Sequence, residues 1–138
     1  MGARYLLDTN TCIYAVSGRH PEVTKRLDRM LPGQAIISVI VYGELMFGAA
    51  KSLRPQDARN RLEALKQVAP VEPLPESAAD FYGLIRAELE RAGTPIGNND
   101  LWIAAHGRAS RLTVVTNNES EFRRVKGLKV ENWVSQTP

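Results

Sequence analysis

The chain has 138 residues, of which 43% are hydrophobic and 24% are charged. This length suits one domain rather than two, and this composition excludes a disordered chain. We therefore expect a single globular domain over residues 1–134 and a loose tail over residues 135–138. The net charge of +3 mildly favours a polyanionic partner such as nucleic acid.

Targeting signals are not visible in the sequence. It contains neither a basic-then-apolar leader nor an apolar run long enough to cross a membrane. Cys12 is the only cysteine, so no internal disulfide can form, and we expect its thiol to be buried. These features favour a cytoplasmic protein.

Short apolar runs predict the strands. The first run, Tyr5–Leu7, stops at Asp8, a residue that caps helices or forms turns. Similar runs predict further strands at Ala35–Ile37, around Val71, at Thr113–Val115 and around Val130.

Apolar residues at helical spacing predict the helices between these strands. One helix follows Ser38 and carries Glu44. Amphipathic patterns indicate three more helices, over Pro55–Val68, over Glu76–Ala92 and from a cap at Asn99 to Ala109. Strands that alternate with helices of this length form parallel sheets, because parallel neighbours need crossover connections. The expected fold is a three-layer α/β domain, with a central parallel sheet of about four to five strands and helices on both faces.

Several acidic residues follow the predicted strands. Asp8 comes directly after the first strand, Asp100 opens a helix, and Asn118 and Glu121 follow the strand that ends at Thr116. Glu44, on the helix after the second strand, can lean over the same place. Ligands of open parallel sheets bind at the carboxyl ends of the strands, so we expect these residues to line one crevice.

Gathered carboxylates repel one another unless a cation supplies the missing charge. An all-oxygen site suits Mg²⁺ or Mn²⁺, whereas zinc calls for clustered histidine or cysteine, and His20 and His106 stand alone. Such a site can hydrolyse phosphodiesters with a metal-activated water and no side-chain nucleophile.

Each acid also has an ordinary structural alternative. Asp8 and Asp100 could each cap a helix, which would stabilise it by about 1 kcal/mol. Glu44 is harder to explain in this way, because a charge within an apolar helical segment costs free energy unless it is paired or metal-bound.

Four stretches resemble the successive motifs of VapC-type toxins of the PIN-domain family. They are Leu6–Asn10, Ser38–Leu45, Ile96–Ala105 and Val115–Phe122, and residues 125–133 that follow also look like that family. Each motif is short, but all four occur in order at compatible spacing over nearly the whole chain.

The resemblance implies a metal-dependent endoribonuclease in which Asp8, Glu44 and Asp100 hold Mg²⁺ and organise the attacking water. Many PIN domains have an aspartate at the position of Asn118, so Glu121 supplies the fourth carboxylate or the site works with three. Asn118 can still offer a carbonyl oxygen but brings no charge.

Two further residues take roles by the same resemblance. Thr116 corresponds to a hydroxyl that hydrogen-bonds a ligand carboxylate, with an ordinary strand-end threonine as the alternative. Arg86 would face the substrate phosphate by analogy, with a solvated arginine as the alternative.

The resemblance also implies partners. Family members of this kind commonly dimerise and occur with a small VapB-type antitoxin, which binds operator DNA and covers the nuclease groove with its tail. The implied substrates are structured RNAs, with transfer RNA, notably the initiator, favoured. The residues themselves select neither the RNA nor the antitoxin.

Two other functions remain open at this point. A receiver or phosphatase-like domain would use an aspartate as phosphoryl acceptor, but the expected second acid is missing because Asn10 stands two residues after Asp8. A non-catalytic binding module would use the acids as caps and the apolar segment around Tyr42, Met46 and Phe47 as an interface.

Overall fold

The computed structural model describes residues 2–134, and the predicted tail over 135–138 lies outside the described residues. Within these residues, five short strands form one parallel sheet in the order β3-β2-β1-β4-β5. The strands are β1 (Tyr5–Leu7), β2 (Ala35–Ser38), β3 (Val71–Glu72), β4 (Thr113–Val115) and β5 (Lys129–Glu131). The predicted parallel sheet is therefore confirmed, with the positions of its strands.

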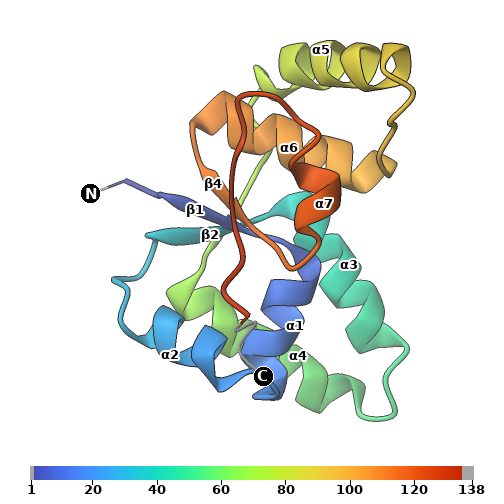
Figure 1. The fold of residues 1–138 in the computed structure, drawn as a ribbon. Helices are drawn as coiled ribbons and strands as arrows, with labels where there is room; N and C mark the ends of the chain where they lie inside the picture. Colours follow the sequence, from blue (N-terminus) through green and yellow to red (C-terminus); the bar gives the residue numbers. More distant parts are fainter. Residues whose placement is uncertain (1, 135–138) are drawn as a thin grey trace.

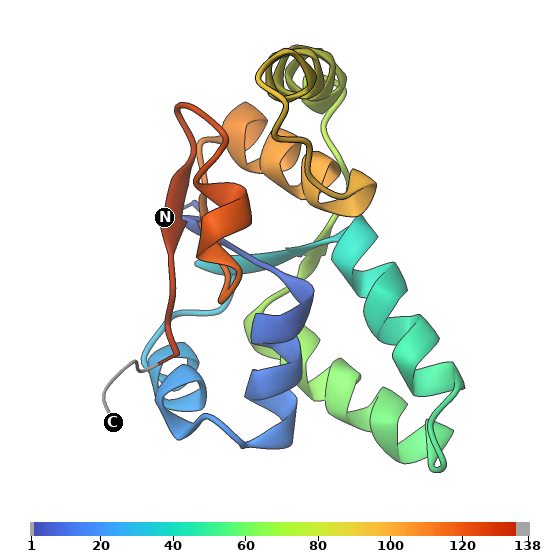
Figure 2. The ribbon, with the colours of Figure 1, turned by 45° about the vertical axis from the view of Figure 1, so that its right-hand side comes forward.

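Helices cover both faces of the sheet, as predicted (Figures 1 and 2). In Figure 1, α5 (Ala78–Arg91) and α6 (Asn98–Ser110) lie above the sheet. Below it lie α1 (Thr9–Ser17), α2 (Pro21–Asp28) and α4 (Pro55–Val68). Two more helices, α3 (Val39–Ala50) and α7 (Glu119–Phe122), begin just after β2 and β4.

Sequence patterns predict the positions of the longer helices well but miss short helices. The helix over Pro55–Val68 is found at the predicted residues, whereas α2 and α7 were not anticipated. The predicted cap at Asn99 is wrong, because α6 begins at Asn98 and Gly97 is its N-cap residue. An αL glycine follows α5, since Gly93 has a φ of 71°, in agreement with the expected end of that helix.

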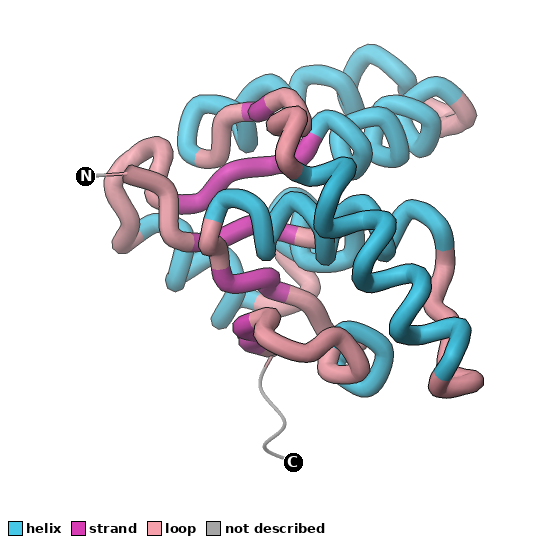
Figure 3. The backbone as a smooth tube through the Cα atoms, turned by 90° about the horizontal axis from the view of Figure 1, so that it is seen from above, coloured by secondary structure: helices cyan, strands magenta, loops and turns pink. Residues whose placement is uncertain are grey.

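The core lies on both faces of β1. Leu6 and Leu7 have no exposed surface, and Cys12 on α1 is likewise buried, as predicted. Burial raises the pKa of the Cys12 thiol, so this cysteine is an inert core residue. Figure 3 shows how short the strands are beside the helices that pack around them. Among residues 2–134, none of the helices has the length and apolar content needed to cross a bilayer.

The buried position of Leu6 gives a test of this core. Replacing Leu6 by Ala removes packed atoms from the middle strand, so we expect it to lower the free energy of unfolding by about 2–5 kcal/mol in urea titrations. Leu53→Ala is the matched control, because Leu53 is fully exposed, and its change should stay within about 0.5 kcal/mol. Equal effects of the two substitutions would contradict the assigned core.

Candidate active site

Asp8 lies where β1 ends, and it both caps a helix and borders the crevice. Its Oδ1 accepts a hydrogen bond of 2.8 Å from the Thr11 amide, which makes it the N-cap of α1. The side chain is almost wholly buried, and burial raises its pKa, while hydrogen bonds from Thr116 and Thr11 act in the opposite direction. The cap and the candidate site role of Asp8 are therefore compatible.

Asp100 lies in the first turn of α6 and is not a cap, since Gly97 is the residue before the helix. Burial, a hydrogen bond with Glu121 and repulsion from Glu121, Asp8 and Glu44 together raise the pKa of Asp100 to about 7. Coulomb repulsion weakens with distance, so acids that raise the pKa of a carboxyl in this way lie near it. The four acids predicted from the sequence are therefore neighbours in the folded chain.

Glu121 is the acid that meets Asp100 most directly. Its Oε1 accepts a hydrogen bond of 3.0 Å from the Gly97 amide, and its Oε2 accepts one from the side-chain amide of Asn118. Burial works to raise the pKa of Glu121, but these bonds, the proton of Asp100 and the charge of Arg124 together lower it. Of the two acids, Asp100 therefore holds the shared proton more strongly, and it releases that proton near neutral pH.

Asn118 and Thr116 support the site without adding charge. The Thr116 hydroxyl accepts a hydrogen bond of 2.9 Å from the backbone amide of Asn118 and also hydrogen-bonds Asp8. Asn118 in turn orients Glu121. The structure thus places the carboxylate of Glu121 beside Asp100 and gives Asn118 a positioning contact.

Glu44 reaches the crevice from α3. The Thr9 hydroxyl donates a hydrogen bond of 3.0 Å to Glu44 Oε1, which ties the end of β1 to the helix after β2. Thr9 and Gly97 were not singled out from the sequence. A hydroxyl next to Asp8 and a glycine just before the Asp100 motif were the only signals, and both are common in ordinary turns.

Arg86 does not contact the carboxylates. It is exposed on α5, where its Nε donates to Glu90 at 2.9 Å and its Nη1 donates to the Tyr82 hydroxyl at 3.0 Å. These bonds raise the pKa of Arg86. Its predicted substrate contact stays a prediction.

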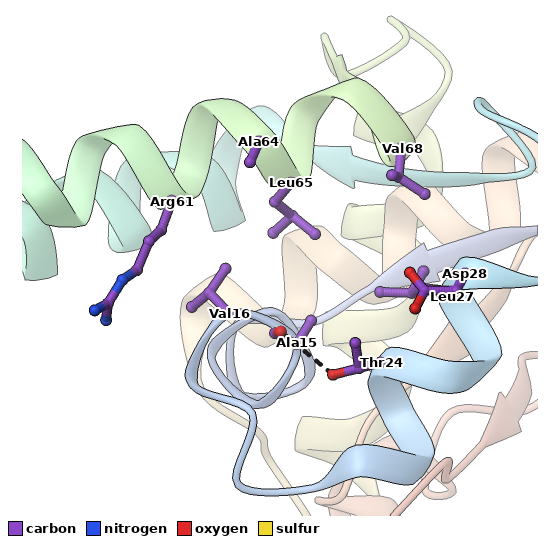
Figure 4. Close-up of a pocket in the computed structure, with 9 residues that line it drawn as sticks. All are labelled: Ala15, Val16, Thr24, Leu27, Asp28, Arg61, Ala64, Leu65 and Val68. Carbon is purple, nitrogen blue, oxygen red and sulfur yellow. Dashed lines mark hydrogen bonds between the residues drawn. The ribbon is translucent and has the colours of Figure 1, made fainter.

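Two cavities differ in their relation to the site, since one is separate from the four acids and the other borders Glu44. The cavity drawn in Figure 4 lies between α1, α2 and α4, and Thr24 donates there to the Ala15 carbonyl, so it is separate from the four acids. A second cavity, of about 210 Å³, has mainly apolar walls on α1, α3 and α4, and Glu44 lines one side of it. This second cavity therefore borders the carboxylates.

The donor set fits a hard divalent cation in its chemistry. In residues 2–134, none of the four acids forms an ion pair with lysine or arginine, and their mutual repulsion adds to the effect of burial on the pKa of Asp100. In the same part of the chain, no three acidic, histidine or cysteine side chains stand close enough to hold one ion. The side chains would therefore have to close around a cation by rotamer changes, which the unbalanced negative charge of the cluster would favour.

Comparison with known proteins identifies the family. The PIN domain profile matches residues 5–128. The chain belongs to the PIN-domain family. It is 39% identical to ribonuclease VapC2 of Rickettsia felis, over 94% of this chain and 97% of the relative. It is 38% identical to the tRNA(fMet)-specific endonuclease VapC of Salmonella typhimurium, over 94% of this chain and 98% of the relative. Within the PIN family it therefore belongs to the VapC ribonucleases.

Solved structures agree with this assignment. DNA-bound VapBC from Salmonella typhimurium contains a chain that superposes with a TM-score of 0.88 at 38% identity, covering 95% of this PIN domain and 98% of that chain. VapBC2 from Rickettsia felis, bound to a promoter DNA fragment, gives a TM-score of 0.85 at 34% identity, covering 94% and 98%. Family membership favours the nuclease hypothesis over the phosphoryl-acceptor and binding-module hypotheses.

The raised pKa of Asp100 predicts how the metal-free protein responds to pH. Its folded-state pKa of about 7 lies above its ordinary value, so this group favours folding at low pH, and that contribution is lost as the pH rises through 7. In EDTA we expect Tm to fall by about 3 °C between pH 5.5 and pH 8, a small shift because the side chain is half-exposed.

Asp100→Asn tests the origin of this shift. The substitution removes the titrating charge, so the variant should keep a higher Tm at pH 8 and lose most of the dependence on pH. A variant as sensitive to pH as the wild type would show that other groups cause the effect.

Proposed function

We propose that this protein is the toxin of a VapBC-type pair and cuts RNA with a divalent metal ion, Mg²⁺ or Mn²⁺, at the site formed by Asp8, Glu44, Asp100 and Glu121. The observation that carries the proposal is the convergence of these acids at the carboxyl ends of β1, β2 and β4, where burial, the hydrogen bond with Glu121 and repulsion from the other acids raise the pKa of Asp100. Membership of the VapC ribonucleases supports the same activity.

A bound divalent cation would activate a water molecule and neutralise charge on the phosphate. Asp8, Glu44 and Asp100 would hold the cation, with Glu121 completing the negative site. The chain's own hydrogen bonds keep these groups in place, because Thr9 holds Glu44 and both Asn118 and Gly97 hold Glu121. Cation binding would also release the proton from Asp100 and so leave all the acids as carboxylates.

The substrate we propose is a structured RNA, with transfer RNA favoured. Support comes from the Salmonella relative, which is named a tRNA(fMet)-specific endonuclease. Proteins that select single-stranded loops read splayed bases and backbone shape. The initiator tRNA is the first candidate to test.

The partner we propose is a VapB-type antitoxin, and contact with operator DNA would pass only through it. Similar chains have been solved as VapBC complexes on DNA. The apolar cavity beside Glu44 offers a surface for such a partner, and Phe47 on the same helix leaves 66% of its surface exposed. We also propose a homodimer, which follows from the family resemblance.

The nuclease proposal predicts the effect of removing one acid. Asp8→Asn should reduce cleavage of total bacterial RNA by about 100-fold or more in Mg²⁺, because one site charge is lost while asparagine still caps α1. Sequencing of new 5′ ends gives the measurement, with an EDTA lane expected to show no cuts. Asp28→Asn on α2 is the matched control and should cut normally, since Asp28 lies outside the crevice. Full activity of Asp8→Asn would refute the site.

Glu121 and Glu119 form a second matched pair on α7. Glu121→Gln should lower the cleavage rate by about 10- to 100-fold, because it weakens the negative site beside Asp100. Glu119 instead binds Arg123 and Asn132, so Glu119→Gln should keep its activity. If both variants cut normally, the fourth carboxylate is dispensable and the site works with three.

A further inference from the structure

A groove begins near the carboxylates and leads away from them along α5. One wall is the face of α5 that carries Phe81, Ile85 and Ala92, and the other is the segment 123–128 between α7 and β5. Figure 1 shows this segment passing beneath α5 and in front of α6. Two adjacent cavities, of about 420 and 320 Å³, make up the groove.

The groove is strongly cationic, and we call it the basic groove. Its only lining carboxylate among the described residues is Glu88. Six cationic side chains line it, with Arg91, Arg124 and Lys126 in the first cavity and Arg108, Arg111 and Lys129 in the second. A single acid leaves most of this charge unbalanced.

The cations are held in place by neutral groups. In the described part of the chain, none of the six forms an ion pair with a carboxylate. Arg124 donates to the Pro95 carbonyl at 3.0 Å. Arg108 donates to the Lys126 carbonyl and lies 5.0 Å from the centre of the Phe81 ring. Neutral acceptors orient these guanidinium groups without cancelling their charge.

Gly127 is needed for this arrangement. A Cβ at this position would lie 3.0 Å from the guanidinium carbon of Arg108, and the residue has a φ of 78°. A side chain here would displace Arg108 and strain the backbone. The local sequence thus leaves room for the guanidinium between α5 and the segment 123–128.

The basic groove opens beside the candidate active site. Arg124 contributes to the lowered pKa of Glu121, and its partner Pro95 lies two residues before Gly97, which donates to Glu121. From Phe81 to Ala92, α5 extends the groove by roughly 16 Å. A strand cut at the carboxylates could therefore continue along α5 for several nucleotides.

We propose that the basic groove binds the sugar–phosphate backbone of the RNA on one side of the cleaved bond. This inference rests on the proposed ribonuclease function. It assigns RNA rather than an acidic protein, because a strand held at the carboxylates must leave the site along some surface, and this one starts there with spaced, unneutralised cations. Contacts to phosphate fix the position of the strand and carry no base preference.

The test measures RNA binding in a variant that does not cut. In an Asp8→Asn background, Arg91→Gln/Lys126→Gln removes two exposed cations from the basic groove. The α2 pair, Lys25→Gln on α2 and Arg29→Gln at its C-cap, removes the same charge elsewhere. The probe is a fluorescein-labelled single-stranded RNA of about 12 nucleotides and mixed sequence, titrated over a range of salt concentrations. Thermal unfolding checks that each variant is folded.

We expect the groove pair to weaken binding about tenfold at moderate salt, and to lower the slope of log K against log salt by about 1.4, the value for two phosphate contacts. The α2 pair should change neither quantity. Equal RNA affinity of the groove-pair and α2-pair variants would overturn the proposal. Displacement of the RNA by polyglutamate at equal charge would also overturn it, by identifying an acidic protein as the occupant. Failure of the wild type to cut RNA would instead refute the nuclease function. The binding assay would still show whether the basic groove binds RNA, because it does not depend on cleavage.

Discussion

The site depends on the parallel pairing of β1 with both of its neighbours. Leu7 is aligned with Ile37 of β2 on one side and with Val115 of β4 on the other. The residues that follow these three positions, Asp8, Ser38 and Thr116, therefore emerge at one edge of the sheet. α3 then begins directly after Ser38 and carries Glu44 to the same edge. Register in the core is thus what determines the distances between the catalytic candidates, since a slip of one residue would turn Asp8 toward the other face.

The cluster is electrostatically unfavourable, and neutral hydrogen bonds maintain it. Amides of Thr11, Gly97 and Asn118 and the hydroxyl of Thr9 all donate to its carboxylates. Such donors favour the charged form of an acid, while burial and mutual repulsion oppose it, and the balance differs at each position. At Asp100, burial, the hydrogen bond with Glu121 and repulsion from the other acids win, and they raise its pKa to about 7. The gathered acids therefore lower the stability of the metal-free chain, and a bound cation would remove that cost once the side chains had closed around it.

Much of this arrangement could be predicted from the sequence, because it depends on local patterns. Apolar runs located the strands, and the acids that follow them located the crevice. The short helix α7 could not be predicted, since its four residues carry no periodic pattern. That helix determines which side chain lies beside Asp100, so only the folded structure distinguishes Asn118 from Glu121 in this position. The basic groove was equally hidden, because its cations come from α5, from α6 and the residue that caps it, and from residues 124–129, which meet only in the folded chain.

Asp8 combines two duties in one side chain, as helix cap and as site acid. Asparagine performs the first duty as well as aspartate does, but it lacks the charge needed for the second. The codons for these two amino acids differ by a single nucleotide. With the role proposed for Asp8, a gene for this protein is one transition away from encoding a chain that keeps its helix cap but is harmless. Selection against toxicity can silence the enzyme by that route while leaving every surface outside the crevice intact.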